Sequence, residues 1–180
     1  RDFDIKSVRY LGKNIKYIEQ KMIQGHQVYY VEITEDYIRD TEHYDFKYDL
    51  NGKYVLSVSE TKNKNTEGDY VLVKFTLNNS EIIDKDIYIY GELTNWDILP
   101  EAKMNYNKQD QHYYGFLYLK QGYYNYQYIA HISTKENIYP IEGEYSETRN
   151  QYSIYIYHAP IWGDYERLVG IAKSTSNSLN

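Results

Sequence analysis

The chain has 180 residues, of which 25 are tyrosine and none is cysteine, and its formal net charge is -6 at pH 7. The lack of cysteine excludes disulfides and thiolate metal sites. The acidic balance argues against nucleic acid as a partner, because contacts with phosphates require a surplus of Lys and Arg. No apolar segment approaches the roughly 20 residues of a membrane-spanning helix. The chain begins with Arg1 and carries no signal peptide, so we expect a piece of a longer or processed protein.

Alternation of apolar and polar residues with a period of two predicts β-strands along the chain. In the segment 69–77, for example, Val71, Val73 and Phe75 share one face with Leu77. The high Tyr content fits this pattern, because Tyr favours the half-buried surface of a sheet. The predicted strands, in chain order, are 3–11, 14–22, 27–33, 43–49, 53–60, 69–77, 87–90, 103–106, 112–119, 123–130, 151–157 and 164–171.

Short turn signals separate these strands, and Asn51-Gly52 is typical of a two-residue hairpin turn in which both residues have positive φ. Eleven or twelve short strands predict an all-β fold of tandem immunoglobulin-like and early-set β-sandwiches. We place the boundary in the polar segment 77–86. Residues 1–80 would form an immunoglobulin-like sandwich, either complete or lacking strands from upstream. Residues 81–172 would form an early-set-like sandwich, and residues 173–180 a flexible tail.

Patterns that carry catalytic or metal chemistry are weak. The five His residues are isolated, and neither a Gly-rich phosphate loop nor a nucleophile elbow is present. Asp164 and Glu166 would share a face of a strand, where a solvated edge is favoured over a cation site. A calcium-loop pattern over 47–58 fails at its first and last ligand positions, Lys47 and Val58. We therefore predict no catalytic residue, no metal site and no cofactor, and an enzyme is the least supported class.

Residues 86–156 resemble the early-set sandwich of glycogen-binding modules. The resemblance is carried by a Gly-x-Leu-x-x-Trp turn, an apolar residue before a hairpin, a strand that ends in Gly and two paired aromatics: Gly91, Leu93, Trp96, Met104, Gly122, Tyr126 and Tyr128. It implies that Trp96 stacks on a sugar. The expected basic residue is replaced by Gln127, however, and the second Trp by Tyr139. Oligosaccharide binding is therefore the alternative function.

A second resemblance covers nearly the whole chain. The segments that carry it are RDFDIKSVRY, DLNGKY, DYVLVKFTL, IYGELTNW, LKQGYYNYQY, IEGEYSETRNQY and DYERLVG. Together they resemble the C-terminal part of the plug-protein family of the type IX secretion system of gram-negative bacteria. His158-Ala159-Pro160 and Trp162 depart from the family pattern, which tends to have Arg before the Pro and small residues near position 162.

The plug resemblance implies a non-catalytic interaction module in the periplasm, associated with the outer membrane. Its partner would be the outer-membrane barrel translocon, which the plug closes when no substrate passes. The candidate contacts for a ligand or partner are Trp96, Gln127, Tyr139 and Trp162. A packing role is favoured for Trp96, and the sequence leaves open whether its ring faces inward or outward. A third hypothesis is a structural spacer within a larger secreted enzyme.

Overall fold

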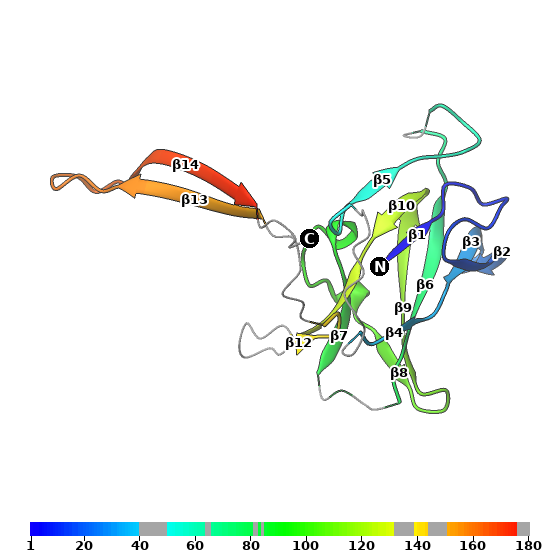
Figure 1. Cartoon of the computed structure of the whole chain (residues 1–180). Helices are drawn as coiled ribbons and strands as arrows, with labels where there is room; N and C mark the ends of the chain where they lie inside the picture. The colour runs from blue at the N-terminus through cyan, green and yellow to red at the C-terminus, as the bar shows by residue number, and fades with distance from the viewer. Residues whose placement is uncertain are drawn as a thin grey trace, which may run out of the picture. The chain divides into compact units, whose positions relative to one another are not determined.

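The computed structural model describes residues 1–39, 50–63, 66–80, 83, 85–131, 139–143 and 151–175. These residues fall into two compact units, one running to Gly143 and the other comprising residues 151–175. The described residues form strands and two short 3₁₀ turns and contain no α-helix, which confirms the predicted all-β class (Figure 1). None of their helical segments is long and apolar enough to cross a membrane.

One layer of the first unit is a six-stranded sheet. Along it run β2 (Ile15–Ile23), β3 (His26–Ile33), β6 (Tyr70–Asn78), β9 (His112–Lys120) and β8 (Asn105–Asn107), while β4 (Asp36–Tyr37) pairs with the end of β6. β3 and β4 run parallel to β6, and the other pairs are antiparallel. β6 and β9 pair over nine residues, from Tyr70 opposite Lys120 to Asn78 opposite His112. This long pair is the centre of the sheet.

Two smaller sheets supply the residues that pack against the six-stranded sheet. The first has the order β1-β10-β5, with β1 (Asp2–Asp4), β10 (Gly122–Asn125) and β5 (Tyr54–Leu56). The second has the order β12-β11-β7, with β12 (Tyr139–Pro140), β11 (Gln127–His131) and β7 (Asp86–Tyr90). Only Tyr126 separates β10 from β11. The 3₁₀ turns η1 (Glu92–Thr94) and η2 (Pro100–Ala102) follow β7.

The core lies between these layers and is rich in aromatic rings. Val71, Val73, Phe75 and Leu77 are fully buried, as the alternation predicts. From the opposite layer, Phe3 meets Phe75 edge to face, with 5.8 Å between ring centroids. Tyr124 stacks between Phe3 and Tyr54, at 5.2 Å from each. Such pairs add about 0.5–1.5 kcal/mol each beyond the burial of their surface.

The contacts divide the chain differently from the predicted ranges 1–80 and 81–172. β6 from the first range pairs along its whole length with β9 from the second, and β1 pairs with β10. Buried residues from both ranges join one core cluster. The boundary placed within 77–86 is therefore wrong for the described residues. Alternation shows which side of a strand is apolar, but it does not show which distant strand pairs with it.

Other predictions differ in extent. The predicted strand 3–11 shortens to β1, and 53–60 shortens to β5, whereas 43–49 lies outside the described residues. The turn with positive φ at Asn51-Gly52 is confirmed: the φ angles are 52° and 77°, and the amide of Lys53 donates to the carbonyl of Leu50 at 3.2 Å. The strand that would complete a hairpin before it lies outside the described residues. Of the predicted tail 173–180, residues 173–175 belong to a strand, and 176–180 lie outside the described residues.

The described residues of the second unit form an antiparallel hairpin, which we call the arm. It consists of β13 (Gln151–His158) and β14 (Arg167–Thr175), joined by residues 159–166. The pairing runs from Gln151 opposite Thr175 to His158 opposite Arg167, with an irregularity between Ile156 and Tyr157. The strand predicted over 164–171 starts later and runs further, because residues before Arg167 belong to the connection.

Candidate interaction surfaces

Trp96 lies in a tight turn after η1, and its indole is partly packed and partly open. Asn95 and Trp96 have φ angles of 54° and 61°, and the amide of Trp96 donates to the carbonyl of Gly91 at 2.9 Å. The ring meets Tyr90 edge to face at 5.6 Å. It also lies against Gly52, where a Cβ atom would come within 2.4 Å of it. The side chain remains 42% exposed, so it both packs on the turn and presents a surface.

The other predicted contacts are spread over the molecule. Gln127 on β11 lies opposite Tyr90 in the strand register, so Gln127 and Trp96 both neighbour Tyr90. Tyr139 on β12 pairs with Ala130 through the backbone, and its side chain is outside the described structure. Trp162 belongs to the arm, in the other unit. Within the first unit, the structure therefore places Trp96 and Gln127 beside the same residue, Tyr90.

A surface that the sequence analysis missed covers the six-stranded sheet on the side away from the core. It consists of side chains from β2, β3, β6 and β9, and we call it the outer face: Tyr17, Tyr30, Glu32, Leu72, Lys74, Tyr114, Phe116 and Tyr118. The register aligns Tyr30, Leu72 and Tyr118 in one row across three strands. Tyr17, Phe116 and Tyr118 are each more than one third exposed.

The outer face combines contacts between aromatic rings with the Lys74–Glu32 ion pair. Tyr30 and Phe116 lie 6.5 Å apart, and Tyr114 and Phe116 lie 5.9 Å apart, with interplanar angles of 46° and 72°. Lys74 Nζ is 3.2 Å from Glu32 Oε1. Lys21 from β2 places Nζ 3.6 Å from the centroid of Tyr30, an amino–aromatic contact. Burial and the nearby carboxylate of Glu32 raise the pKa of Tyr30.

The tilt of the rings bears on what the outer face can bind. A pyranose ring needs an open aromatic plane, whereas neighbouring rings here meet at steep angles and present edges as well as faces. Tyr and Phe are enriched in protein–protein interfaces, and Tyr is among the residues that contribute most to their binding energy. The outer face is therefore better suited to a protein surface than to a sugar chain.

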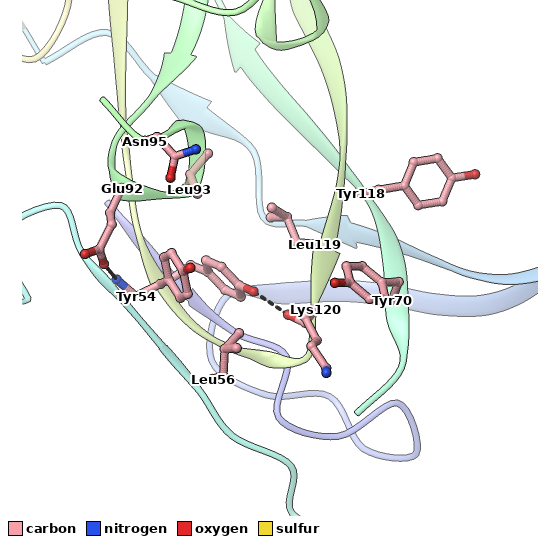
Figure 2. A pocket seen from close by; sticks show the side chains of 10 residues that line it. Tyr54, Leu56, Tyr70, Glu92, Leu93, Asn95, Tyr118, Leu119 and Lys120 are labelled. Atoms are coloured by element: carbon pink, nitrogen blue, oxygen red, sulfur yellow. Dashed lines mark hydrogen bonds between the residues drawn. The ribbon is translucent and has the colours of Figure 1, made fainter. Parts of the chain in front are cut away.

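A hollow of about 250 Å³ lies beside η1 and β5. Figure 2 shows Tyr54, Leu93 and Leu119 around it. Two of its polar side chains bond to the backbone. Glu92 Oε2 accepts a hydrogen bond from the amide of Tyr54 at 2.9 Å, and the hydroxyl of Tyr124 donates to the carbonyl of Lys120. The Tyr118 side chain points away from the hollow in Figure 2. The first bond holds η1 against β5, and the second joins β10 to the end of β9.

A largely buried polar network ties Arg1, just before β1, to β4 and β11. Asp36 Oδ1 accepts from Arg1 Nη1 at 2.9 Å, and Asp36 Oδ2 accepts from the hydroxyls of Tyr126 and Tyr128 at 2.6 and 2.8 Å. Arg1 Nε also donates to Glu142 Oε1 at 2.7 Å. The Arg1 side chain is only 3% exposed, so its charge depends on these two carboxylates.

The electrostatics of this network are those of a structural cluster. Burial tends to lower the pKa of the Arg1 guanidinium, but the carboxylates of Glu142 and Asp36 outweigh it and raise the pKa. Burial raises the pKa of the Tyr126 and Tyr128 hydroxyls well above the ordinary value, and the charge of Asp36 adds to the shift. Both phenols thus remain protonated donors. Within the described ranges, no group of three or more His, Asp or Glu side chains is arranged to hold a metal ion.

The arm presents apolar side chains throughout. Eleven large apolar residues between 151 and 175 are more than one third exposed. In the connection between its strands, Ile161 and Trp162 are 91% and 93% exposed. The alternation in YSIYIY therefore predicts a strand correctly, but side chains on both faces of that strand are exposed.

Comparison with known proteins gives little beyond the fold. No family model matches the sequence, and a comparison with curated proteins also gives no match. A solved structure, described as that of a hypothetical protein from Parabacteroides merdae ATCC 43184, is similar, with 34% sequence identity and a TM-score of 0.85. The similarity covers 98% of this chain and 44% of that chain. The chain therefore spans less than half the length of this longer protein, and the β-sandwich fold recurs in it.

Proposed function

We propose that this chain is a non-catalytic interaction module, part of a periplasmic plug subunit that closes the outer-membrane translocon of the type IX secretion system. The resemblance of the sequence to the plug family, extending from RDFD at the start to RLVG near the end, supports this function. The plug would act sterically, so the quantity that matters is the free energy of binding, and no turnover is involved.

The outer face of the six-stranded sheet is the observation that carries the proposal. It combines Tyr17, Phe116 and Tyr118, all exposed, on a rigid sheet whose other side is the core. A partner would bury these rings at little cost in side-chain entropy, because each ring has only two χ angles and its backbone is already fixed. The neighbouring Lys74–Glu32 pair would set the orientation more than the affinity.

Co-purification from outer-membrane extracts in mild detergent, with the captured barrel identified by mass spectrometry, tests this function. We expect the wild-type chain to retain a large barrel protein of the secretion system. The double variant Phe116→Ala, Tyr118→Ala should weaken binding at least tenfold, the loss expected for one or two dominant residues. Tyr10→Ala removes an aromatic ring that is 73% exposed outside the outer face and should leave binding unchanged. Absence of a barrel partner with the wild-type chain would contradict the proposal.

Binding of an oligosaccharide is a second candidate, favoured by the open part of the Trp96 indole beside Tyr90 and Gln127. Maltooligosaccharides can be titrated while Trp fluorescence is followed. Since Trp96 and Trp162 are the two tryptophans of the chain, the Trp162→Phe background reports on Trp96 alone. A saturable change that disappears in Trp96→Ala supports sugar binding. An unchanged signal at millimolar sugar would rule this candidate out.

A further inference from the structure

The two faces of the arm are built differently, and each carries large apolar side chains; on the second face Ser153 also lies opposite Lys173. On one face Tyr152, Ile154 and Ile156 stand on β13, opposite the small residues Ser174, Ala172 and Gly170 on β14. On the other face Tyr155 lies opposite Ile171, and Tyr157 opposite Leu168. The first face is therefore stepped, with a row of large side chains beside a row of small ones. The second carries large side chains on both strands.

A ribbon of this kind is not a stable end state in water. An isolated two-stranded hairpin is marginally stable at best, because it has no third element against which to bury its side chains. From typical side-chain areas, the eleven apolar residues of the arm expose on the order of 1,000 Å². A standard protein interface buries about 800 Å² on each partner. The arm alone thus offers enough surface for a complete interface.

The net charge of the arm indicates what kind of surface can bind it. Residues 151–175 contain Asp164 and Glu166 against Arg167 and Lys173, so the arm is formally neutral within a chain of net charge -6. β13 carries no acidic or basic side chain other than His158 at its end. Recognition therefore rests on apolar packing. Lipid does not fit the ribbon, because β13 pairs with β14 alone in the described structure, and the outward backbone groups need hydrogen-bond partners that a bilayer core lacks.

We propose that the arm docks onto a further domain of the same polypeptide, with Ile156, Trp162 and their apolar neighbours packed against an uncharged surface of that domain. The length of the Parabacteroides merdae protein points to this occupant. That protein matches 98% of this chain, so the match includes the arm, and yet this chain covers only 44% of it. More than half of that chain is therefore available to cover the arm. The proposal does not depend on the partner proposed above.

Hydrogen exchange measured by mass spectrometry tests the docking in the 180-residue chain and in the full-length chain of the same gene. In the full-length chain we expect the β13 and β14 amides to exchange at least 100-fold more slowly than in the 180-residue chain. The amides of β9, in the centre of the sandwich, serve as the internal reference and should exchange alike in both. Equal exchange of the arm in both chains would overturn the proposal, as would a gene that encodes no further domain.

Side-chain truncation provides a second measurement. Trp162→Ala and Ile156→Ala should each lower the Tm of the full-length chain by several degrees and leave the Tm of the 180-residue chain unchanged. Tyr10→Ala, also exposed but outside the arm, should change neither. Protection of the arm that rises with protein concentration would mean that a second copy covers it, which also overturns the proposal. If the arm is protected in the full-length chain but no barrel protein is captured, the plug function is contradicted and the docking of the arm is not.

Discussion

The sandwich and the arm contain strands with the same sequence pattern but opposite environments. In β6, Val71, Val73 and Phe75 alternate with partly polar residues and are fully buried. In β13, Tyr152, Ile154 and Ile156 alternate in the same way, yet each is more than half exposed. The difference lies in what is available to cover each strand. Alternation is a property of the strand, whereas burial is a property of its neighbours.

The largest expected effect contrasts truncation of an apolar side chain in the two units. Phe75→Ala should lower the free energy of unfolding by about 3–5 kcal/mol, because it leaves a cavity beneath Phe3 and Tyr126. Ile154→Ala in the arm should cost less than about 1 kcal/mol in the 180-residue chain, since the side chain is already solvated. Urea unfolding followed by circular dichroism measures both. Similar losses for the two variants would mean that the arm is packed in the 180-residue chain.

The buried network should contribute the next largest effect. Asp36→Asn keeps the shape but removes the charge that faces Arg1 and accepts from Tyr126 and Tyr128. We expect a loss of about 2–3 kcal/mol, because hydrogen bonds to buried charged groups are worth more than neutral ones. Glu35→Gln is the matched control, since the Lys16–Glu35 pair is solvent-exposed and such pairs contribute at most about 1 kcal/mol. Equal losses would contradict a structural role for the network.

Alanine substitutions at two glycines with positive φ, one beside Trp96 and one away from it, measure how much the packing of the indole matters. Gly52→Ala should cost about 2 kcal/mol, because it combines backbone strain with a clash against the indole. At Gly25 the φ angle is also positive, but no atom lies within 4 Å of the added Cβ, so Gly25→Ala should cost about 1 kcal/mol from strain alone. Thermal unfolding compares the two. In a Trp96→Ala background the difference between them should vanish; if it persists, the indole is not the cause.

The last effect, which is absent at neutral pH, is a loss of stability in alkaline solution that arises from Tyr126 and Tyr128 in the sandwich. The pKa values of Tyr126 and Tyr128 are raised in the folded state, so their stabilising effect is complete below the unfolded value of 10.0. It is lost as pH rises above that value, by about 1.4 kcal/mol per pH unit for each phenol. Urea midpoints between pH 8 and 11 measure the loss. Tyr128→Phe should reduce the slope, and an unchanged slope in this variant would contradict the prediction.

Features that depend on a few neighbouring residues could be predicted from the sequence, whereas the candidate surfaces depend on distant ones. Asn51-Gly52 indicates its turn because few other residues tolerate two consecutive positive φ angles. The outer face could not be found in this way. In HYYGFLYLK both faces of the strand carry apolar residues, so the alternation does not show that Tyr114, Phe116 and Tyr118 face outward. Nor does it place Tyr30, more than 80 residues away in sequence, next to Phe116.

The sequence by itself determined the all-β class, the inward face of β6 and the turn at Asn51-Gly52, because side-chain alternation and backbone sterics act over a few residues. Only the tertiary structure decided that β6 pairs with β9 across the expected boundary, and that Arg1 is buried beside Asp36 and Glu142. It also decided that the apolar strands of the arm lie open. Strand pairing and burial depend on which distant surfaces meet, and a local pattern is compatible with many such pairings.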